Sequence, residues 1–566
     1  MKRILKIKTI VLIGSALLTL SACGTIPSFP QHHILMFNYH GKPVDPCTFG
    51  ETVTSDTSDL AWKNFCVGAP KSVWFNKYRK FNDDPKSNIY TDKKEPEFNT
   101  YTGKIFDAID DKFPGNNKKK ILIHVHGGLN QRGEALAWST SDLWGPPLYD
   151  VILNSPEGGY FPIFVNWHSG LLSTYGDHLL NVRQGEDWSA KSWYWKAGRY
   201  ATSPVYLAVD IVRGVVRAPL VWASFFLNEA KTMPVFEYFD PKDAVHVAGD
   251  IKCRKKGWKT DPGAPERCVP TWPPTKPEKF IIHTGQDYRN YWDMTKSAAQ
   301  YTVTLPSKLA VAPMIDSMGT SAWNNMLRRV NLLNNIDDEF HTDRSISQRA
   351  WKDPKLGLAR TPVHGGLSHF MQLFIERYKS DIQSGNMEIV LVGHSMGTIV
   401  LNEMIRNYGV YHDPATGEKW LFNQIVYMAA ACTISHYEST VIPYLARNKK
   451  AHFYNVMLGR MAEIRENNVL GLSPRGSLLV WIDEFLSNPL THRDRTLGRY
   501  DNFLMAVHNI PESMRDRIHI KSFNTGQKYP DYPEPQEHGD FRNFKFWDNE
   551  CLEDYPDNHK DCFRKK

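Results

Sequence analysis

One short stretch of this 566-residue chain, residues 388–398, constrains the fold more than any other. A mainly apolar run at residues 389–392 leads directly into Gly393-His394-Ser395-Met396-Gly397, and apolar side chains recur with helical spacing in the residues that follow. Because Gly393 and Gly397 lack Cβ atoms, a strand and a helix can approach closely on either side of Ser395. The stretch therefore predicts a buried strand, a sharp turn and a helix, as in an α/β fold with a parallel sheet.

A serine at such a turn is a candidate nucleophile. Its hydroxyl is held clear of the backbone, and the N–H groups at the start of the next helix face the same point, where they favour negative charge on an oxygen. The alternative interpretation is a glycine-rich turn without chemistry. The apolar run before Ser395 and the helical pattern after it favour the nucleophile.

In this context the motif Gly393-His394-Ser395-Met396-Gly397 resembles the nucleophile turn of the α/β-hydrolase superfamily. The form with histidine before the serine resembles lipases, esterases and related acyl hydrolases. The resemblance covers about residues 118–167 and 368–541. It implies an α/β-hydrolase core with a mostly parallel sheet, a large and mainly helical cap insertion, and a small N-terminal extension.

A second motif supports the same family. His126-Gly127-Gly128 follows a short β-rich run at residues 121–125 and resembles the oxyanion loop of α/β-hydrolases. The resemblance implies that the backbone N–H of Gly128, or that of Leu129, holds the oxyanion together with the N–H of Met396. The alternative is a glycine-rich connection between a strand and a helix.

A serine hydroxyl is a poor nucleophile until a base takes its proton. His538 lies about fifteen residues past the last expected strand, at residues 517–523, and the family order of serine, acid and histidine implies that it is the base. His508 and His519 lie before or within that strand and fit this order less well.

The acid that orients the histidine is less constrained. It is expected after the strand at residues 452–457, and Glu463, Glu466 and Asp483 all follow that strand. Order and distance along the chain favour Glu463. The other two carboxylates stay as alternatives.

The N-terminus has the features of an export signal. Lys2 and Arg3 belong to a positive segment, and residues 10–20 form an apolar segment too short for a comfortable membrane span. Leu20-Ser21-Ala22-Cys23 then resembles the bacterial lipobox. That resemblance implies removal of residues 1–22 and acylation of Cys23, and Gly24 in place of aspartate favours the outer membrane, facing the periplasm. An ordinary signal peptide with a chance cysteine is the alternative.

The other cysteines agree with an oxidising compartment. Three pairs are close in sequence and predict disulfides, whereas Cys432 lies in an apolar run and is expected to be a buried free thiol. No Cys-x-x-Cys occurs, so we expect no metal site, and the resemblance implies no organic cofactor. The predicted pairs are Cys47 with Cys66, Cys253 with Cys268, and Cys551 with Cys562.

A long apolar stretch lies inside the expected cap. Ser203-Pro204 predicts a helix start and Pro219 an end or a kink, and Asp210, Arg213 and Arg217 fall on one narrow stripe of that helix. One interpretation is that cap helices pack on the core. The other is an amphipathic surface that touches lipid or a lipid-like substrate. Three charges and a proline argue against a transmembrane span.

These observations divide the chain and assign a function. The net charge of +7 is mild for this length, fits an anionic membrane surface and does not indicate nucleic-acid binding. We expect a membrane-anchored serine hydrolase that cleaves a carboxylic ester of an acyl or lipid substrate. The alternative is a non-catalytic envelope lipoprotein that uses the scaffold for binding. The expected segments are a signal peptide (1–22), a tether with an irregular extension (23–110), a first core segment (111–168), the cap (169–360), a second core segment (361–548) and a tail (549–566).

Overall fold

The structure is a computed structural model. It describes residues 31–37, 41, 43–44, 95–128, 148–156, 159–183, 186–187, 193–232, 258–261, 264–270, 282–284, 291–335, 365–413, 417–459, 462–463, 466, 474, 476–523, 534–535, 537–553 and 562–564.

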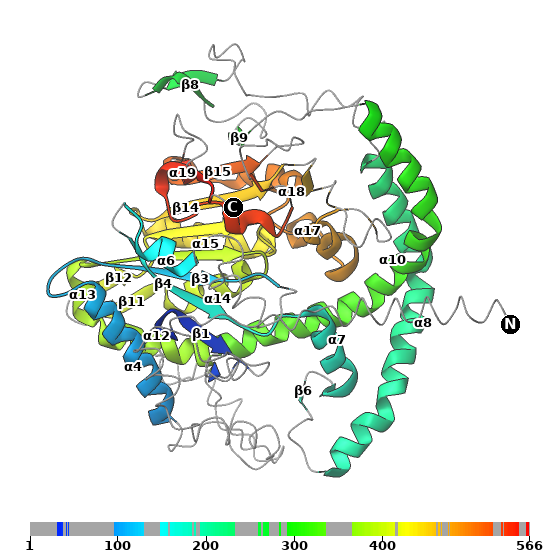
Figure 1. Cartoon of the computed structure of the whole chain (residues 1–566), viewed down its shortest axis with the longest axis horizontal. Helices are drawn as coiled ribbons and strands as arrows, with labels where there is room; N and C mark the ends of the chain where they lie inside the picture. The colour runs from blue at the N-terminus through cyan, green and yellow to red at the C-terminus, as the bar shows by residue number, and fades with distance from the viewer. Residues whose placement is uncertain are drawn as a thin grey trace, which may run out of the picture.

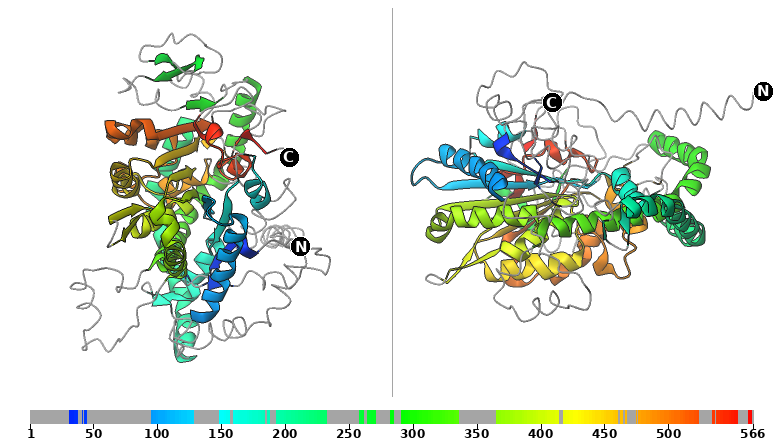
Figure 2. Two further views of the ribbon diagram at one scale, coloured as in Figure 1. Left: turned by 90° about the vertical axis from the view of Figure 1, so that its left-hand side faces the viewer. Right: turned by 90° about the horizontal axis from the view of Figure 1, so that it is seen from below.

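A mostly parallel sheet forms the centre of the molecule, with helices on both of its sides (Figures 1 and 2). Each neighbouring pair of strands in this sheet is parallel except β1 and β2. The prediction of an α/β fold is therefore confirmed. In spatial order the strands described are β2 (Pro43–Val44), β1 (Ile34–Phe37), β4 (Phe161–Asn166), β3 (Lys119–Val125), β10 (Met387–His394), β13 (Gln424–Met428), β14 (His452–Leu458), β15 (Ile518–Phe523) and β9 (Ile282–Thr284).

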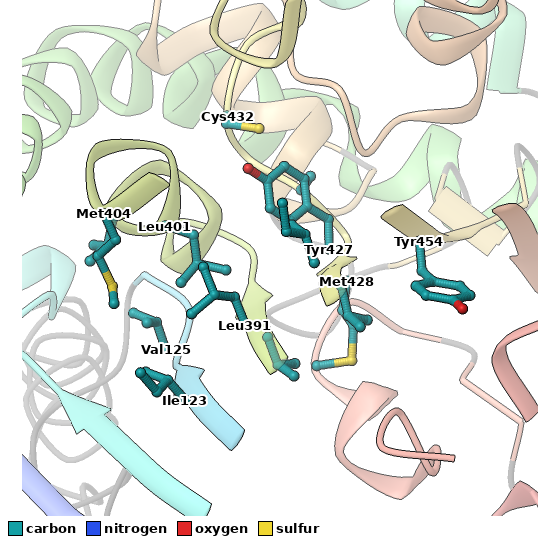
Figure 3. Packing of buried hydrophobic residues seen from close by; sticks show 14 of the residues in the cluster. Ile123, Val125, Leu391, Leu401, Met404, Tyr427, Met428, Cys432 and Tyr454 are labelled. Atoms are coloured by element: carbon teal, nitrogen blue, oxygen red, sulfur yellow. The ribbon is translucent and has the colours of Figure 1, made fainter. Parts of the chain in front are cut away.

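The central strand β10 is hydrophobic because the sheet is covered on both faces. Leu391 pairs with Ile123 of β3 on one side and with Ile425 of β13 on the other. All three side chains are fully buried, and burying one such side chain stabilises the fold by about 1.5–3 kcal/mol. Figure 3 shows how Leu391 and its neighbours pack beneath the helix that follows β10.

The helices around the sheet match the expected alternation of strand and helix. The helices α12 and α13 lead into β10, and β13 is followed by α15. The main helices beside the sheet are α4 (Glu95–Lys112), α6 (Leu148–Leu153), α12 (Gly366–Arg377), α13 (Lys379–Ser384), α14 (Gly397–Tyr408) and α15 (Ile434–Arg447).

The remaining elements are short or lie in the expected cap. They are η1 (Gln31–His33), α7 (Leu171–Leu180), β5 (Val182–Arg183), β6 (Glu186–Asp187), α8 (Trp193–Thr232), β7 (Trp258–Asp261), β8 (Ala264–Pro270), α10 (Tyr291–Asn334), β11 (Val410–Asp413), β12 (Gly417–Trp420), α17 (Leu478–Trp481), η7 (Ile482–Leu486), η8 (His492–Asp494), α18 (Tyr500–Ala506), η9 (Val507–Asn509), η10 (Glu512–Arg517), η11 (Asp540–Asn543) and α19 (Asn549–Glu553).

The long helix α8 begins earlier and ends later than its prolines predict. Pro204 does not start the helix and Pro219 does not end it, since both lie inside α8. Both prolines are exposed, so each ring lies on the side of the helix that makes no packing contact with the core. The helix α10 runs alongside α8, and the pair stands at one side of the sheet (Figure 1).

Besides the two-residue β2, two strands of the sheet come from segments where no core strand was expected. β1 belongs to the N-terminal extension, and its four residues are all buried against β4. β9 lies within the expected cap and pairs with β15 at the far edge of the sheet. The sequence pattern alone does not identify a short strand that lacks alternating polarity. Both strands are therefore recognised only by their pairing with β4 and β15 in the folded sheet.

The chain just after His538 forms no regular α-helix over residues 541–547. Only the 3₁₀ helix η11 forms there, because Phe541, Phe544 and Phe546 are all fully buried and a regular helix would not direct all three inward. Cys551 and Cys562 form the predicted disulfide. Cys432 is a buried free thiol, as expected, and burial raises its pKa to about 12.

Some predictions fall outside the described residues. Cys23 and the lipobox do, as do Cys47, Cys66 and Cys253, so acylation and the other two disulfides stay predictions. Among the helices that the structure describes, none combines the length and the apolar character needed to cross a bilayer.

Candidate active site

Ser395 sits at a strained turn between β10 and α14. Its φ angle is +52°, a left-handed conformation that costs a residue with a side chain about 1–2 kcal/mol. The turn is held from β13 and the chain after it: the N–H of Ser395 donates to the carbonyl of Met428 at 2.9 Å, and the N–H of Ala431 donates to the carbonyl of Ser395 at 3.1 Å. Backbone strain fixed from both sides in this way is a feature of functional sites.

The two glycines of the motif are needed for close packing. A Cβ at Gly397 would lie 2.9 Å from the carbonyl oxygen of His126, and one at Gly393 would lie 2.8 Å from a methyl of Leu401. Both distances are shorter than real Cβ contacts. The prediction that strand and helix approach closely around Ser395 is therefore confirmed.

The loop after β3 packs directly on this turn. A Cβ at Gly127 would lie 2.9 Å from the Cβ of Ser395, and one at Gly128 would lie 2.7 Å from the Cγ of Met396. Met396 is the N-cap of α14, so its N–H has no partner within the helix. The structure thus brings Gly128 and Met396, the two expected oxyanion donors, next to the candidate nucleophile.

His126 fixes that loop. Its Nε2 accepts the backbone N–H of Trp167 at 3.0 Å, so its Nδ1–H donates to the carbonyl of Gly127 at 2.6 Å. Burial lowers the pKa of His126 to about 4, which keeps the ring neutral and this donor and acceptor pattern intact. Ser169 adds a hydrogen bond from its hydroxyl to the same carbonyl at 3.2 Å. His126 belongs to the His-Gly-Gly motif, but no sequence signal indicated this role.

The segment with the candidate base is tied to the same turn through His394. The Nε2 of His394 donates to the carbonyl of His538 at 2.9 Å, and the two ring centroids are 5.1 Å apart. Both residues are buried. His394 occupies the variable position of the motif, and no sequence signal indicated that it positions His538.

Four polar atoms of the three expected catalytic residues are buried and have no hydrogen-bond partner among the described residues. They are the Oγ of Ser395, both ring nitrogens of His538 and the Oε1 of Glu463. They are four of 24 such atoms among the described residues, so an unpaired buried atom does not by itself mark the site. No hydrogen bond joins Ser395 to His538, or His538 to Glu463, in this structure.

Burial, and then the neighbouring His394, hold the pKa of His538 well below its usual value, so the imidazole is neutral. To act as a base it needs a carboxylate partner that raises this pKa towards the working pH. Burial also raises the pKa of Glu463 to about 8, opposed by the hydroxyl of Ser477, which donates to its Oε2. At neutral pH the carboxyl group of Glu463 therefore mostly keeps its proton, and it ionises as the pH rises through about 8.

The three candidate acids have different environments. Glu466 accepts the backbone N–H of His538 at 2.9 Å, which holds the main chain of the histidine and not its ring. Asp483 accepts hydrogen bonds from the backbone and side chain of Thr496, from Arg499 and from Asn502, at 2.6–3.2 Å. Both oxygens of Asp483 are thus engaged in fixing the loop, whereas Glu463 keeps one oxygen without a partner.

One group of three side chains among the described residues could in principle hold a metal ion: His452, His519 and Glu553. The Nδ1 of His452 lies 3.5 Å from the Nε2 of His519, and the hydroxyl of Tyr454 donates to Glu553 at 2.7 Å. These residues lie at the amino ends of β14 and β15 or beside them. Ser395 follows the carboxyl end of β10. Because these strands are parallel, the three side chains lie at the opposite ends of the strands from Ser395.

Comparison of the chain with protein-family models, with curated proteins and with solved structures finds no match in any of the three. The function is therefore argued from the residues and their geometry.

Proposed function

We propose that this chain is a serine hydrolase that cleaves a carboxylic ester of an acyl or lipid substrate through a covalent acyl-enzyme. The observation that carries the proposal is the strained turn of Ser395 with the glycine loop after β3 packed against it. The hydrogen bond from His394 to the backbone of His538, which ties the candidate base to the same turn, supports the same chemistry.

The proposed reaction has two halves. The Oγ of Ser395 attacks the acyl carbon while its proton passes to His538, and the backbone N–H groups of Met396 and Gly128 hold the negative oxygen. His538 then gives the proton to the departing alcohol, which leaves an acyl-Ser395 ester. A water molecule repeats the sequence, with His538 as base and then acid, and releases the carboxylic acid and the free serine.

Glu463 is proposed to complete the triad. Its free Oε1 and the unpaired ring nitrogens of His538 would satisfy one another in a hydrogen bond that fixes the tautomer of the imidazole and stabilises the imidazolium. Glu466 already holds the backbone of His538 at 2.9 Å and follows Glu463 by three residues, which supports the placement of both groups near the histidine.

Ser395 is fully buried, so the substrate reaches it only after neighbouring segments move. Opening of this kind is common where a site excludes water during the reaction. We further propose that acylated Cys23 anchors the enzyme to the periplasmic side of a bacterial outer membrane. Labelling with a palmitate analogue should mark the protein, and Cys23→Ser should remove the label.

The experiment that tests the activity uses a fluorophosphonate probe and a short p-nitrophenyl ester. Wild type should be labelled and should turn over the ester, whereas Ser395→Ala should do neither. Ser439→Ala changes an exposed serine on α15 and should behave as wild type. Folded wild-type protein without labelling and without turnover would overturn the enzyme and leave the binding-scaffold alternative.

A further inference from the structure

The helix α8 has its polar side turned inward. Asp210 is only 4% exposed and accepts hydrogen bonds from the hydroxyls of Tyr175, at 2.9 Å, and Ser321, at 3.1 Å. Arg217 forms a two-pronged ion pair with the buried Asp316, at 2.8 and 3.1 Å. The polar stripe predicted from the sequence therefore faces α7 and α10.

Close packing between α8 and α10 accompanies this inward polar stripe. Gly214 lies on the same side of α8, and a Cβ added to it would lie 3.1 Å from the carbonyl oxygen of Pro313 and 3.1 Å from the hydroxyl of Ser317. Small residues and buried, paired charges at a helix contact are characteristic of helices whose outer side meets hydrocarbon.

The outer side of α8 is aliphatic and exposed. Between residues 205 and 222 the charged residues are Asp210, Arg213 and Arg217; the first is buried and the other two are half-buried at the edge. No charged side chain lies on the exposed side of this segment. We call this surface the α8 face; it consists of Val205, Leu207, Val209, Ile211, Val212, Val215, Val216 and Leu220, which are 39–71% exposed.

This arrangement is the reverse of that of a surface helix in water, which turns charges outward and apolar residues to the core. Contiguous exposed apolar surface of this kind marks a site of contact with a protein or a membrane. The helix α10, which packs beside α8, also exposes apolar side chains: Val303 is 80% exposed and Met314 58% exposed.

The composition of the α8 face distinguishes a bilayer from a protein partner. Protein interfaces are enriched in aromatic residues, methionine and arginine, and carry about one hydrogen bond per 100–200 Å². The α8 face has only aliphatic side chains and offers no side-chain donor or acceptor. Exposed aromatic residues of α8 lie just beyond both ends of the α8 face. Tyr200, 56% exposed, comes before it, and Trp222 and Phe226, 39% and 45% exposed, come after it.

Aromatic residues are enriched at the level of the lipid headgroups, where a helix that lies in the plane of the membrane surface would place both of its ends. The indole N–H of Trp222 donates to the carbonyl of Leu309 at 2.8 Å. The ring therefore exposes no unpaired hydrogen-bond donor. From Val205 to Leu220 the face is about 22 Å long, at 1.5 Å per residue, which is shorter than the hydrocarbon core of about 30 Å.

We propose that the α8 face inserts into one leaflet of a bilayer and holds the protein flat on the membrane surface. The occupant is acyl-chain hydrocarbon, because the face is aliphatic, lacks polar groups and is bounded by aromatic residues. A lipid on Cys23, as the lipobox predicts, would place the bilayer within reach, and one acyl anchor is strengthened by a second membrane contact. This docking does not depend on the chemistry of Ser395.

The test places an environment-sensitive fluorophore on the full-length protein at Val212→Cys, and at Leu490→Cys as a matched control. Leu490 is 95% exposed and lies outside the α8 face. The protein is added to phosphatidylethanolamine–phosphatidylglycerol vesicles with or without a nitroxide on the acyl chains. The label at position 212 should shift to the blue and be quenched several-fold more by the nitroxide than the label at 490. Equal, weak quenching at both positions would overturn the proposal.

A second measurement separates a membrane from a second copy of the chain. If the α8 face were a dimer interface, the label at position 212 would be shielded without vesicles and the protein would sediment as a dimer; that result would also overturn the proposal. The triple variant Val205→Asp/Val212→Asp/Val216→Asp should bind vesicles about 10-fold more weakly or worse. It should still hydrolyse a soluble p-nitrophenyl ester, and vesicle binding measured with Ser395→Ala keeps this test independent of the proposed activity.

Discussion

The Nε2 of His394 donates a hydrogen bond to the carbonyl oxygen of His538 at 2.9 Å, so the residue before the candidate nucleophile holds the backbone of the candidate base. The contact bridges 144 residues of sequence. It joins the turn after β10 to the segment after β15, and the ring of His394 also packs against Phe541 of that segment, with the centroids 5.9 Å apart. Burial lowers the pKa of His394 to about 4, so the ring stays a neutral donor over the working pH range.

A change at His394 should therefore lower catalysis through position. His394→Phe keeps the size of the ring and removes the donor, and we expect kcat to fall about 100-fold, as for a misplaced catalytic group, with little change in KM. His394→Gln retains an N–H donor of similar reach and should recover part of the loss. Steady-state kinetics with a p-nitrophenyl ester measure both. Normal kcat in folded His394→Phe would contradict the positioning role.

The packing of the glycine loop on Ser395 makes a second prediction. Gly127→Ala would place a methyl 2.9 Å from the Cβ of Ser395 and should displace the oxyanion donor, with a loss of about 10²–10³-fold in kcat. Gly539→Ala is the matched control, since a Cβ there meets nothing within 4 Å although the residue adjoins His538. Circular dichroism confirms folding of both. Equal activity of the two variants would argue against Gly128 as an oxyanion donor.

The three carboxylates should separate into catalytic and structural groups. Glu463→Gln removes the charge that orients the imidazolium, and the corresponding change in a serine protease lowers kcat about 10⁴-fold. Glu466→Gln should cost much less, because its partner is the backbone of His538. The kcat values of purified Glu463→Gln, Glu466→Gln and Asp483→Asn identify the carboxylate that the reaction needs.

Asp483→Asn should act on stability. It removes the carboxylate that holds Arg499 at 2.9 Å and leaves Glu484 at 3.6 Å, so the free energy of unfolding should fall by about 1–3 kcal/mol. Thermal unfolding measures this loss. A folded, stable Asp483→Asn with a large loss of kcat, beside a nearly normal Glu463→Gln, would move the acid to Asp483.

The raised pKa of Glu463 predicts a pH dependence of activity. The triad needs the ionised carboxylate, and burial raises the pKa of Glu463 to about 8, so the rate should rise as the pH increases from 6 to 9. The groups around the carboxyl are Ser477, Glu466, Arg499 and Asp483. Glu463→Gln should lose this rise, and a profile of the same shape in wild type and variant would contradict the assignment.

The same shift predicts a pH dependence of stability. In the unfolded chain Glu463 ionises near its usual pKa of 4.5, whereas in the folded protein it keeps its proton up to about pH 8. The folded state thus binds more protons between these values, and the contribution of Glu463 to stability is lost as the pH rises. The free energy of unfolding of Glu463→Gln, compared with that of wild type, should therefore increase from pH 5 to pH 8. Chemical denaturation at several pH values measures the difference.

The sequence by itself determined the local features of this protein. The apolar run before Ser395, the two glycines around it and the helix spacing after it specified a strand, a turn and a helix, because each depends only on neighbouring residues. The closeness of Cys551 and Cys562 along the chain likewise indicated their disulfide. These predictions needed no knowledge of distant contacts.

Tertiary structure decided what depends on residues far apart in the chain. β1 became a core strand only by pairing with β4, and α8 continued through Pro204 and Pro219, whose rings lie on its exposed side. The role of His394 required the segment of His538 to return to the same edge of the sheet. The direction of the α8 face was likewise open in the sequence: a helical stripe of charges fixes which residues lie together, but only the buried partners of Asp210 and Arg217 decide that this stripe faces inward.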